Sequence, residues 1–190
     1  MGTHLAGVPW GTGSKGQVGL EQSIPRWHLR TGKKGGQAVG LTRKGKGTKV
    51  MLVADGEGIP MGTLVESAQK AEVKLADATL AKVKVRRPRG RPRSRPKEVV
   101  ADKGYDSQPL RRRWRRRGIK PCIPRRRSAK PRRGRKPDLE GYSHRWIVER
   151  TFSWLGNFRR LLVRWERHAH IYLAFLLIAC AVISLRFISG

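Results

Sequence analysis

Acidic residues are scarce in this chain of 190 residues, in which 13 Asp and Glu stand against 43 Lys and Arg. The formal net charge of +30 repels itself within a compact chain and attracts polyanions, of which nucleic acid is the simplest. An anionic membrane surface is the competing partner. The few carboxylates are therefore informative wherever two of them stand close together.

Cysteine is almost absent as well, with only Cys122 and Cys180, far apart and in no CxxC pair. This pattern argues against a disulfide framework and against a zinc module, and it fits a reducing compartment. The first residues, MGTHLAGVPWGTG, have neither a charged head nor a long apolar run, so no secretory signal is predicted. We expect a cytoplasmic, nucleoid-associated protein.

Long apolar runs are also lacking. The hydrophobic share of 38% is below that of most globular proteins, so the core must come from a few segments. The longest run, IYLAFLLIACAVISL at 171–185, has about 15 residues where a bilayer span needs about 20. It predicts a buried core helix, and no membrane partner is expected.

Two strands and a helix are predicted in the first half of the chain. Val50–Val53 and 59–65 flank the sequence DGEG, a strong hairpin signal because glycine tolerates the positive φ of tight turns. Residues 66–82 have apolar residues at helical spacing. Residues 1–31 have no clear period and form an unplaced head, ahead of a domain at 32–190.

The second half alternates short strands with helices. EVVAD, ending at Asp102, and IKPCIP predict strands, and 107–118 predicts a helix between an N-cap Ser107 and a stop at Gly118. A helix at 138–158 and a helical pair at 161–187 follow, which makes the fold class mixed α/β. One face of the 138–158 helix is predicted to carry Tyr142, Arg145, Trp146, Glu149, Phe152 and Leu155.

Two basic stretches, 86–97 and 125–136, are rich in Pro, Gly and Ser and predict exposed linkers that touch phosphates. Between them, Asp102 ends a predicted strand, a place from which a carboxylate can hold a cation. Glu149, on a helix between arginines, could equally be an ordinary surface ion-pair residue. Asp55 and Asp106 are predicted to be turn or cap residues.

A family resemblance joins the two acidic positions. ADKGYDS, followed by YSHRWIVERTFSWLGNFRRL, resembles the DDE-type insertion-sequence transposases, and roughly 33–187 resembles them in order. Their Tyr-Arg-Glu signature matches Tyr142, Arg145 and Glu149. The basic residue that the signature places seven residues after the Glu falls on Gly156, with arginines nearby.

The resemblance implies a ribonuclease-H-like mixed sheet flanked by helices. It also implies DNA transposition and recombination through endonuclease cleavage and strand transfer, with carboxylates holding Mg²⁺ or Mn²⁺. Asp102 would be the second and Glu149 the third of these carboxylates. DNA, as transposon ends and target, and a homodimer are the expected partners. Predicted DNA contacts are Lys103, Arg111, Arg112, Arg113, Arg145, Arg159 and Arg160.

One departure concerns the first aspartate of that family, which falls near Arg26, where no acidic residue stands. The nearest upstream is Glu21, and Asp55 could substitute only by leaving its turn. We therefore expect a truncated or frameshifted copy, without the first aspartate and with its first strand in doubt. The alternative function is that of a catalytically inert, basic DNA-binding remnant of a transposase.

Overall fold

The structure is a computed structural model that describes residues 22–32, 35–43, 45–85, 89–126 and 137–189, the first of these as backbone only. A twisted sheet has the strand order β2-β3-β1-β5-β6, with β4 also paired to β3 and β7 to β1. The strands are β1 (Gln22–Gly32), β2 (Gly40–Thr42), β3 (Gly45–Ala54), β4 (Pro60–Ser67), β5 (Glu98–Val100), β6 (Lys120–Cys122) and β7 (Val163–Arg164). Strands β1, β3 and β4 pair antiparallel, whereas β5 lies parallel to β1 and β6 parallel to β5.

The predicted hairpin is confirmed. Strands β3 and β4 pair antiparallel, with Val50 opposite Val65. The backbone amide of Asp55 donates to the carbonyl of Ile59, and that of Gly58 donates to the carbonyl of Asp55, which closes the turn.

The first strand, which the sequence left in doubt, is present. Gln22–Gly32 forms β1 between β3 and β5. The segment SIPRWHL has little β-branching or alternation, so its extended state depends on pairing with neighbours on both sides. Strand β1 also crosses the domain boundary predicted between residues 31 and 32. The rest of the unplaced head, residues 1–21, lies outside the described residues.

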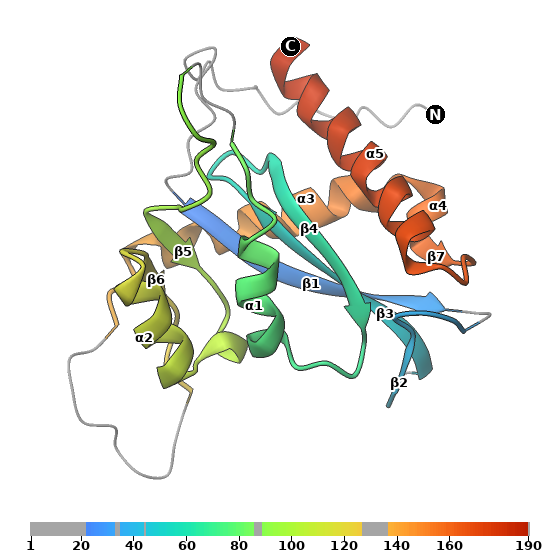
Figure 1. Ribbon diagram of the computed structural model, residues 1–190, viewed down its shortest axis with the longest axis horizontal. Coiled ribbons are helices and arrows are strands. Elements are labelled where there is room, and N and C mark those ends of the chain that lie inside the picture. The colour runs from blue at the N-terminus through green and yellow to red at the C-terminus, as the bar shows by residue number, and fades with distance from the viewer. Residues whose placement is uncertain (1–21, 33–34, 44, 86–88, 127–136, 190) are drawn as a thin grey trace, which may run out of the picture.

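Helices cover both faces of the sheet (Figure 1). They are α1 (Glu72–Leu80), α2 (Gln108–Arg116), α3 (Trp146–Gly156), α4 (Arg159–Leu162) and α5 (Ala169–Ser189), with 3-10 turns η1 (Lys103–Tyr105) and η2 (Glu140–Arg145). Val50 and Leu52 of β3 pack with residues of α3 and α5. Met51 and Val53 pack with residues of α1 and α2. Strand β3 is thus buried on both sides, as an interior strand of a sheet covered on both faces should be.

Three helix predictions need correction. The helix expected from residue 66 begins at Glu72, because β4 continues to Ser67. The helix expected from residue 138 begins as η2, and its buried face is Ile147, Val148, Thr151, Phe152 and Leu155. Trp146, expected on that face, is 50% exposed. The expected final pair is the short α4, the strand β7 and the long α5.

The apolar helix α5 is longer than its run of apolar letters and is buried on one side only. Tyr172, Leu176, Ala179, Cys180 and Ile183 enter the core. Exposed apolar residues on the helix include Leu177, Ile178, Leu185 and Ile188. By length and composition this helix could cross a membrane, a property that core helices of soluble proteins share.

Candidate active site

Asp102 lies directly beyond the carboxyl end of β5, as predicted. The backbone amide of Ala101 donates to the carbonyl of Cys122, which holds the end of β5 against β6. The chain then enters η1, where the amide of Tyr105 donates to the carbonyl of Asp102 at 2.9 Å. We call residues 102–106 the acidic turn. The side chain of Asp102 is partly exposed, so it can meet a ligand at this edge of the sheet.

The register between β1 and β5 indicates which position of β1 corresponds to Asp102. Gln22 pairs with Glu98 and Ser23 with Val99, in parallel. Position 26 lies as far beyond Gln22 as position 102 lies beyond Glu98, so the two positions correspond if the register is extended past Val100, where β5 ends. Neighbouring strands are about 4.8 Å apart. The sequence places Arg26, and no carboxylate, at this position.

Glu149 lies in the first turn of α3, where Arg145 binds it. Nη1 of Arg145 donates to Oε1 of Glu149 at 2.6 Å, and both side chains are more than a third exposed. This is an ion pair one helical turn apart, the arrangement that composition alone would suggest. This geometry agrees both with Glu149 as a carboxylate of a metal site and with Glu149 as an ordinary surface ion-pair residue.

The helix that carries Glu149 is fixed to the β3–β4 turn. The hydroxyl of Thr151 donates to the carbonyl of Gly58 at 2.8 Å, and Nη2 of Arg150 donates to the carbonyl of Glu57 at 2.7 Å. The Arg150 guanidinium also lies 4.8 Å from the ring centroid of Trp146 and 4.9 Å from that of Trp154. Burial lowers the pKa of Arg150. Glu149 is therefore held by a well-anchored helix.

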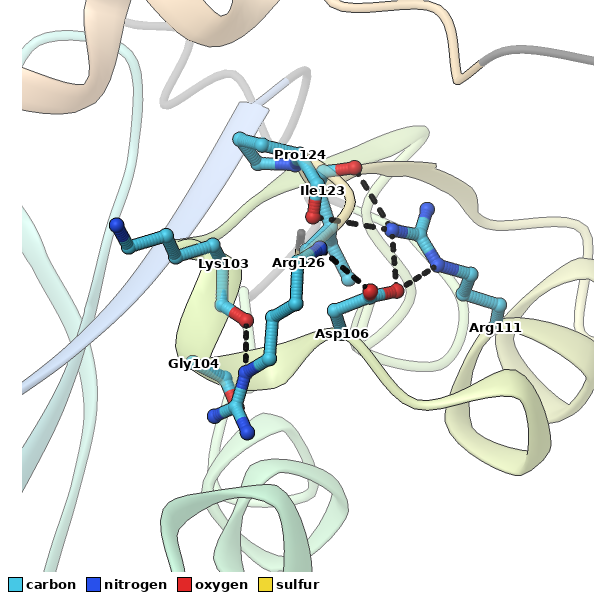
Figure 2. Close-up of polar contacts among 7 residues, drawn as sticks. All are labelled: Lys103, Gly104, Asp106, Arg111, Ile123, Pro124 and Arg126. Carbon is cyan, nitrogen blue, oxygen red and sulfur yellow. Dashed lines mark hydrogen bonds and ion pairs between the residues drawn. The ribbon is translucent and has the colours of Figure 1, made fainter. Parts of the chain in front are cut away.

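Asp106 and Arg111 form a buried ion pair behind the acidic turn (Figure 2). Oδ1 of Asp106 accepts from Nε of Arg111 at 3.1 Å and from Nη2 at 2.9 Å. Nη2 also donates to the carbonyl of Ile123 at 2.8 Å. Arg111 is only 3% exposed, so the prediction that it contacts DNA is wrong. Charge alone does not distinguish three consecutive arginines, of which this one faces the core.

The side chain of Asp106 forms an ion pair with Arg111 rather than a helix cap. At the N-terminal ends of η1 and α2, neither Asp102 nor the predicted N-cap Ser107 makes a side-chain capping bond. The other oxygen of Asp106, Oδ2, accepts from the backbone amide of Arg126 at 2.8 Å. The side chain of Asp106 is fully buried, so it is not available to a metal ion.

Arg126 was not predicted as a site residue, yet it contacts the acidic turn three times. Besides its amide, its Nε donates to the carbonyl of Lys103 and its Nη2 to that of Gly104, both at 2.9 Å (Figure 2). In the sequence it belongs to a basic run with no period, 125–136, of which 127–136 lies outside the described residues. No sequence signal distinguishes it from its neighbours.

The other predicted DNA contacts lie at or near the surface. Lys103, Arg112, Arg113, Arg159 and Arg160 are exposed, and Arg145 is partly exposed. Three of them have carboxylate partners: Arg113 with Asp77 at 2.8 Å, Arg160 with Glu166 at 2.7 Å and Arg145 with Glu149 at 2.6 Å. Of the first basic linker, 89–97 is described, and it is exposed apart from Pro96 and, in part, Arg93.

The described residues do not make a complete metal site. In the part of the chain with described side chains, no group of three Asp, Glu, His or Cys residues comes together. Asp55, the candidate substitute, points its Oδ1 at the backbone amides of Glu57 and Ile59, at 3.0 and 2.8 Å. Glu21 lies outside the described residues. Oxygen donors suit Mg²⁺ in kind, but two carboxylates without a third do not fit the expected site in number.

Comparisons with known proteins agree with the resemblance. The family model for the transposase DDE domain matches residues 22–183. The chain is 42% identical over 138 residues to a Burkholderia cepacia protein named "Putative transposase for insertion sequence element IS402". That match covers 72% of this chain and 62% of the relative, so it leaves more than a third of the relative unmatched.

A solved structure, of the piggyBac transposase synaptic complex with hairpin DNA, superposes with a TM-score of 0.53 at 13% identity. It covers 88% of this chain and 46% of that one, which supports the fold alone. The family match begins at Gln22, the first residue of β1, and includes Asp102, the anchored helix α3 and most of α5. The chain belongs to the transposase DDE domain family.

Proposed function

We propose that this chain is the ribonuclease-H-like domain of a DNA transposase, acting on insertion-sequence ends and target DNA. The observation that carries the proposal is the position of Asp102, at the carboxyl end of a strand that lies parallel to the central β1. An antiparallel β4-β3-β1 meander continued by parallel β5 and β6 is the sheet that such a domain requires.

DNA is the partner that the charge favours. A net charge of +30, with exposed arginines on α2 and α4 and along 89–97, provides many phosphate contacts and little sequence readout. If about six phosphates are neutralised, affinity for duplex DNA falls about a thousandfold between 50 and 200 mM salt. An affinity that stays flat over that range would reject DNA as the partner. Retention on nucleoid DNA in the cytoplasm would follow from the same charge.

Strand cleavage by this chain is expected to be weak or absent. Asp102 and Glu149 supply the second and third of three expected carboxylates, and position 26 carries a positive charge where the first would stand. A bound divalent ion would activate water or a DNA hydroxyl in this family, and the residues described here do not complete its site. Lys103 and Arg145 would serve to hold phosphate beside the two carboxylates. The inert DNA-binding remnant is the second candidate function, and Arg26 is the observation that favours it.

The deciding experiment compares the native chain, Asp102→Ala, Arg26→Asp and Arg26→Asp with Asp102→Ala on insertion-sequence end DNA with Mg²⁺ or Mn²⁺. We expect no cleavage by the native chain, cleavage by Arg26→Asp, and its loss on adding Asp102→Ala. Arg26→Ala is the matched control, because it removes the arginine without adding a ligand. Cleavage by the native chain that Asp102→Ala leaves unchanged would reject the assignment of Asp102. Failure of Arg26→Asp, with DNA binding intact, would favour the inert remnant.

A further inference from the structure

We infer that Arg126 is a positioning residue, which holds the acidic turn so that Asp102 keeps a fixed place at the edge of the sheet. Its guanidinium donates to two successive backbone carbonyls of the turn, those of Lys103 and Gly104, each at 2.9 Å. A guanidinium presents its donors in a fixed planar fork, whereas a lysine ammonium is a flexible point donor whose geometry is not set in advance. The inference rests on the proposed function only for the role of Asp102.

The turn needs such support because η1 is only three residues long. Two backbone bonds close η1, from the amide of Tyr105 to the carbonyl of Asp102 and from that of Asp106 to the carbonyl of Lys103. A single 3-10 turn is too short to be stable by itself. Arg126 binds the carbonyl of Lys103 as a second donor, and it binds that of Gly104, so its side chain stabilises peptide groups that shape the turn.

The segment after β6 serves as the rigid side of this contact. Arg111 binds the carbonyls of Ile123 and Pro124 while it pairs with Asp106 (Figure 2). The amide of Arg126 then donates to the same carboxylate. In Figure 2 the carboxylate of Asp106 lies between the two arginines, which approach the turn from α2 and from the segment after β6. Arg111 therefore fixes the backbone from which the Arg126 side chain reaches the turn.

The two arginines differ in what their removal would do. Arg111 is buried, so replacing it would disturb the core as well as the turn. The side chain of Arg126 is exposed, and its guanidinium bonds go to the backbone of the turn. Arg126 can therefore be changed with little effect on global folding, which makes its local role measurable.

The test is amide hydrogen exchange in the full chain, followed residue by residue for native protein, Arg126→Ala and Arg126→Lys. With both guanidinium bonds lost, we expect exchange of the Tyr105 and Asp106 amides to speed up about tenfold in Arg126→Ala. Arg126→Lys should stay closer to Arg126→Ala than to the native chain, because a flexible ammonium lacks the fixed fork whose Nε and Nη2 each hold one carbonyl. Arg112→Ala, which removes an exposed arginine on α2, is the matched control and should exchange as the native chain does.

Each outcome decides the role of Arg126. Faster exchange confined to the acidic turn, with an unchanged melting temperature, supports positioning by Arg126. Unchanged amide exchange in Arg126→Ala overturns this role, and so does exchange at the native rate in Arg126→Lys. An equally large rise in the exchange of β3 amides also overturns it, because it would show global destabilisation only. Mn²⁺ binding to the Arg26→Asp variant, with and without Asp102→Ala, is measured in parallel. Its failure would count against the proposed function while leaving the exchange result to decide the role of Arg126.

Discussion

Two turns of this protein each contain a buried aspartate, and each turn stabilises the carboxylate of its aspartate in a different way. Asp55, in the β3–β4 turn, accepts two backbone amides, and burial raises the pKa of its carboxyl group. Asp106, in the acidic turn, accepts one backbone amide and a two-nitrogen contact from a buried arginine. The first aspartate shapes a turn through hydrogen bonds to the backbone, whereas the second joins three segments through an ion pair.

The difference bears on function. The turn at Asp55 receives α3, through the carbonyls of Glu57 and Gly58, and so indirectly places Glu149. The turn at Asp106 contains Asp102 itself. Both supports lie outside the set of carboxylates that could meet a metal, and both would persist in a chain that had lost cleavage. An inert remnant of a transposase can therefore keep a folded, DNA-binding site region.

The largest effect is expected from Asp106→Ala. This change leaves the Arg111 cation buried without its carboxylate, which costs about 3–5 kcal/mol of the free energy of unfolding. Urea denaturation of the native chain and the variant measures it. Asp138→Ala, which removes the exposed pair with Lys120 and an exposed hydrogen bond from the amide of Glu140, is the control and should cost about 1 kcal/mol.

A double variant keeps that prediction testable if Asp106→Ala does not fold. Adding Arg111→Met removes the unpaired cation, and we expect it to restore part of the lost stability. The recovery is incomplete because the carbonyls of Ile123 and Pro124 lose their donor. An Asp106→Ala variant as stable as Asp138→Ala would show that the pair contributes no more than a surface ion pair.

The next effect is expected at the other turn. Asp55→Ala removes the acceptor of two backbone amides at a site only 2% exposed, so a loss of about 1–3 kcal/mol is expected. It should be smaller than that of Asp106→Ala, because no buried counter-charge is left behind. Thermal unfolding of both variants under one condition makes the comparison. A larger loss at Asp55 than at Asp106 would reverse the ranking on which the comparison rests.

A smaller effect is expected from Gly58→Ala. Gly58 has φ +91°, and an added Cβ would meet Oγ1 of Thr151 at 3.1 Å. The positive φ alone costs an alanine about 1–2 kcal/mol. The contact should also move α3 away from the turn, so hydrogen exchange in 146–152 should rise more than in α1. Gly56→Ala, with open space around its Cβ, is the matched control.

Local signals explain which elements could be predicted. The hairpin needs only apolar runs and turn glycines, which neighbouring residues specify. Strand β1 could not be predicted, because its pairing with β3 and β5 supplies what SIPRWHL lacks. Within RRRWRRR, spacing from Leu110 and Trp114 could have indicated that Arg111 faces inward, but charge dominated the interpretation. Asp102 followed from its place after a strand, whereas Glu149 depended on the family resemblance.

The smallest effect, and the sharpest test of the comparison, is the pH dependence of Asp55→Asn. Asparagine keeps an acceptor oxygen for the amides of Glu57 and Ile59 and removes the charge. Burial raises the pKa of Asp55 above its usual value in the folded state, so that state binds the proton more tightly than the unfolded chain does. Stability from this group is thus full at low pH and falls as the pH rises from the unfolded pKa through the folded one.

An asparagine at position 55 does not titrate, so the native chain should lose stability relative to Asp55→Asn as the pH rises above 3.8, the usual pKa of an aspartate. Urea midpoints at several pH values measure that difference, in which the other carboxylates cancel. The Asp106 carboxylate is paired with a guanidinium, so Asp106→Asn should instead lose stability relative to the native chain at neutral pH. If Asp55→Asn gained no stability relative to the native chain as the pH rises, or Asp106→Asn were as stable as the native chain at neutral pH, the contrast between a buried aspartate held by backbone amides and one held by an arginine would fail.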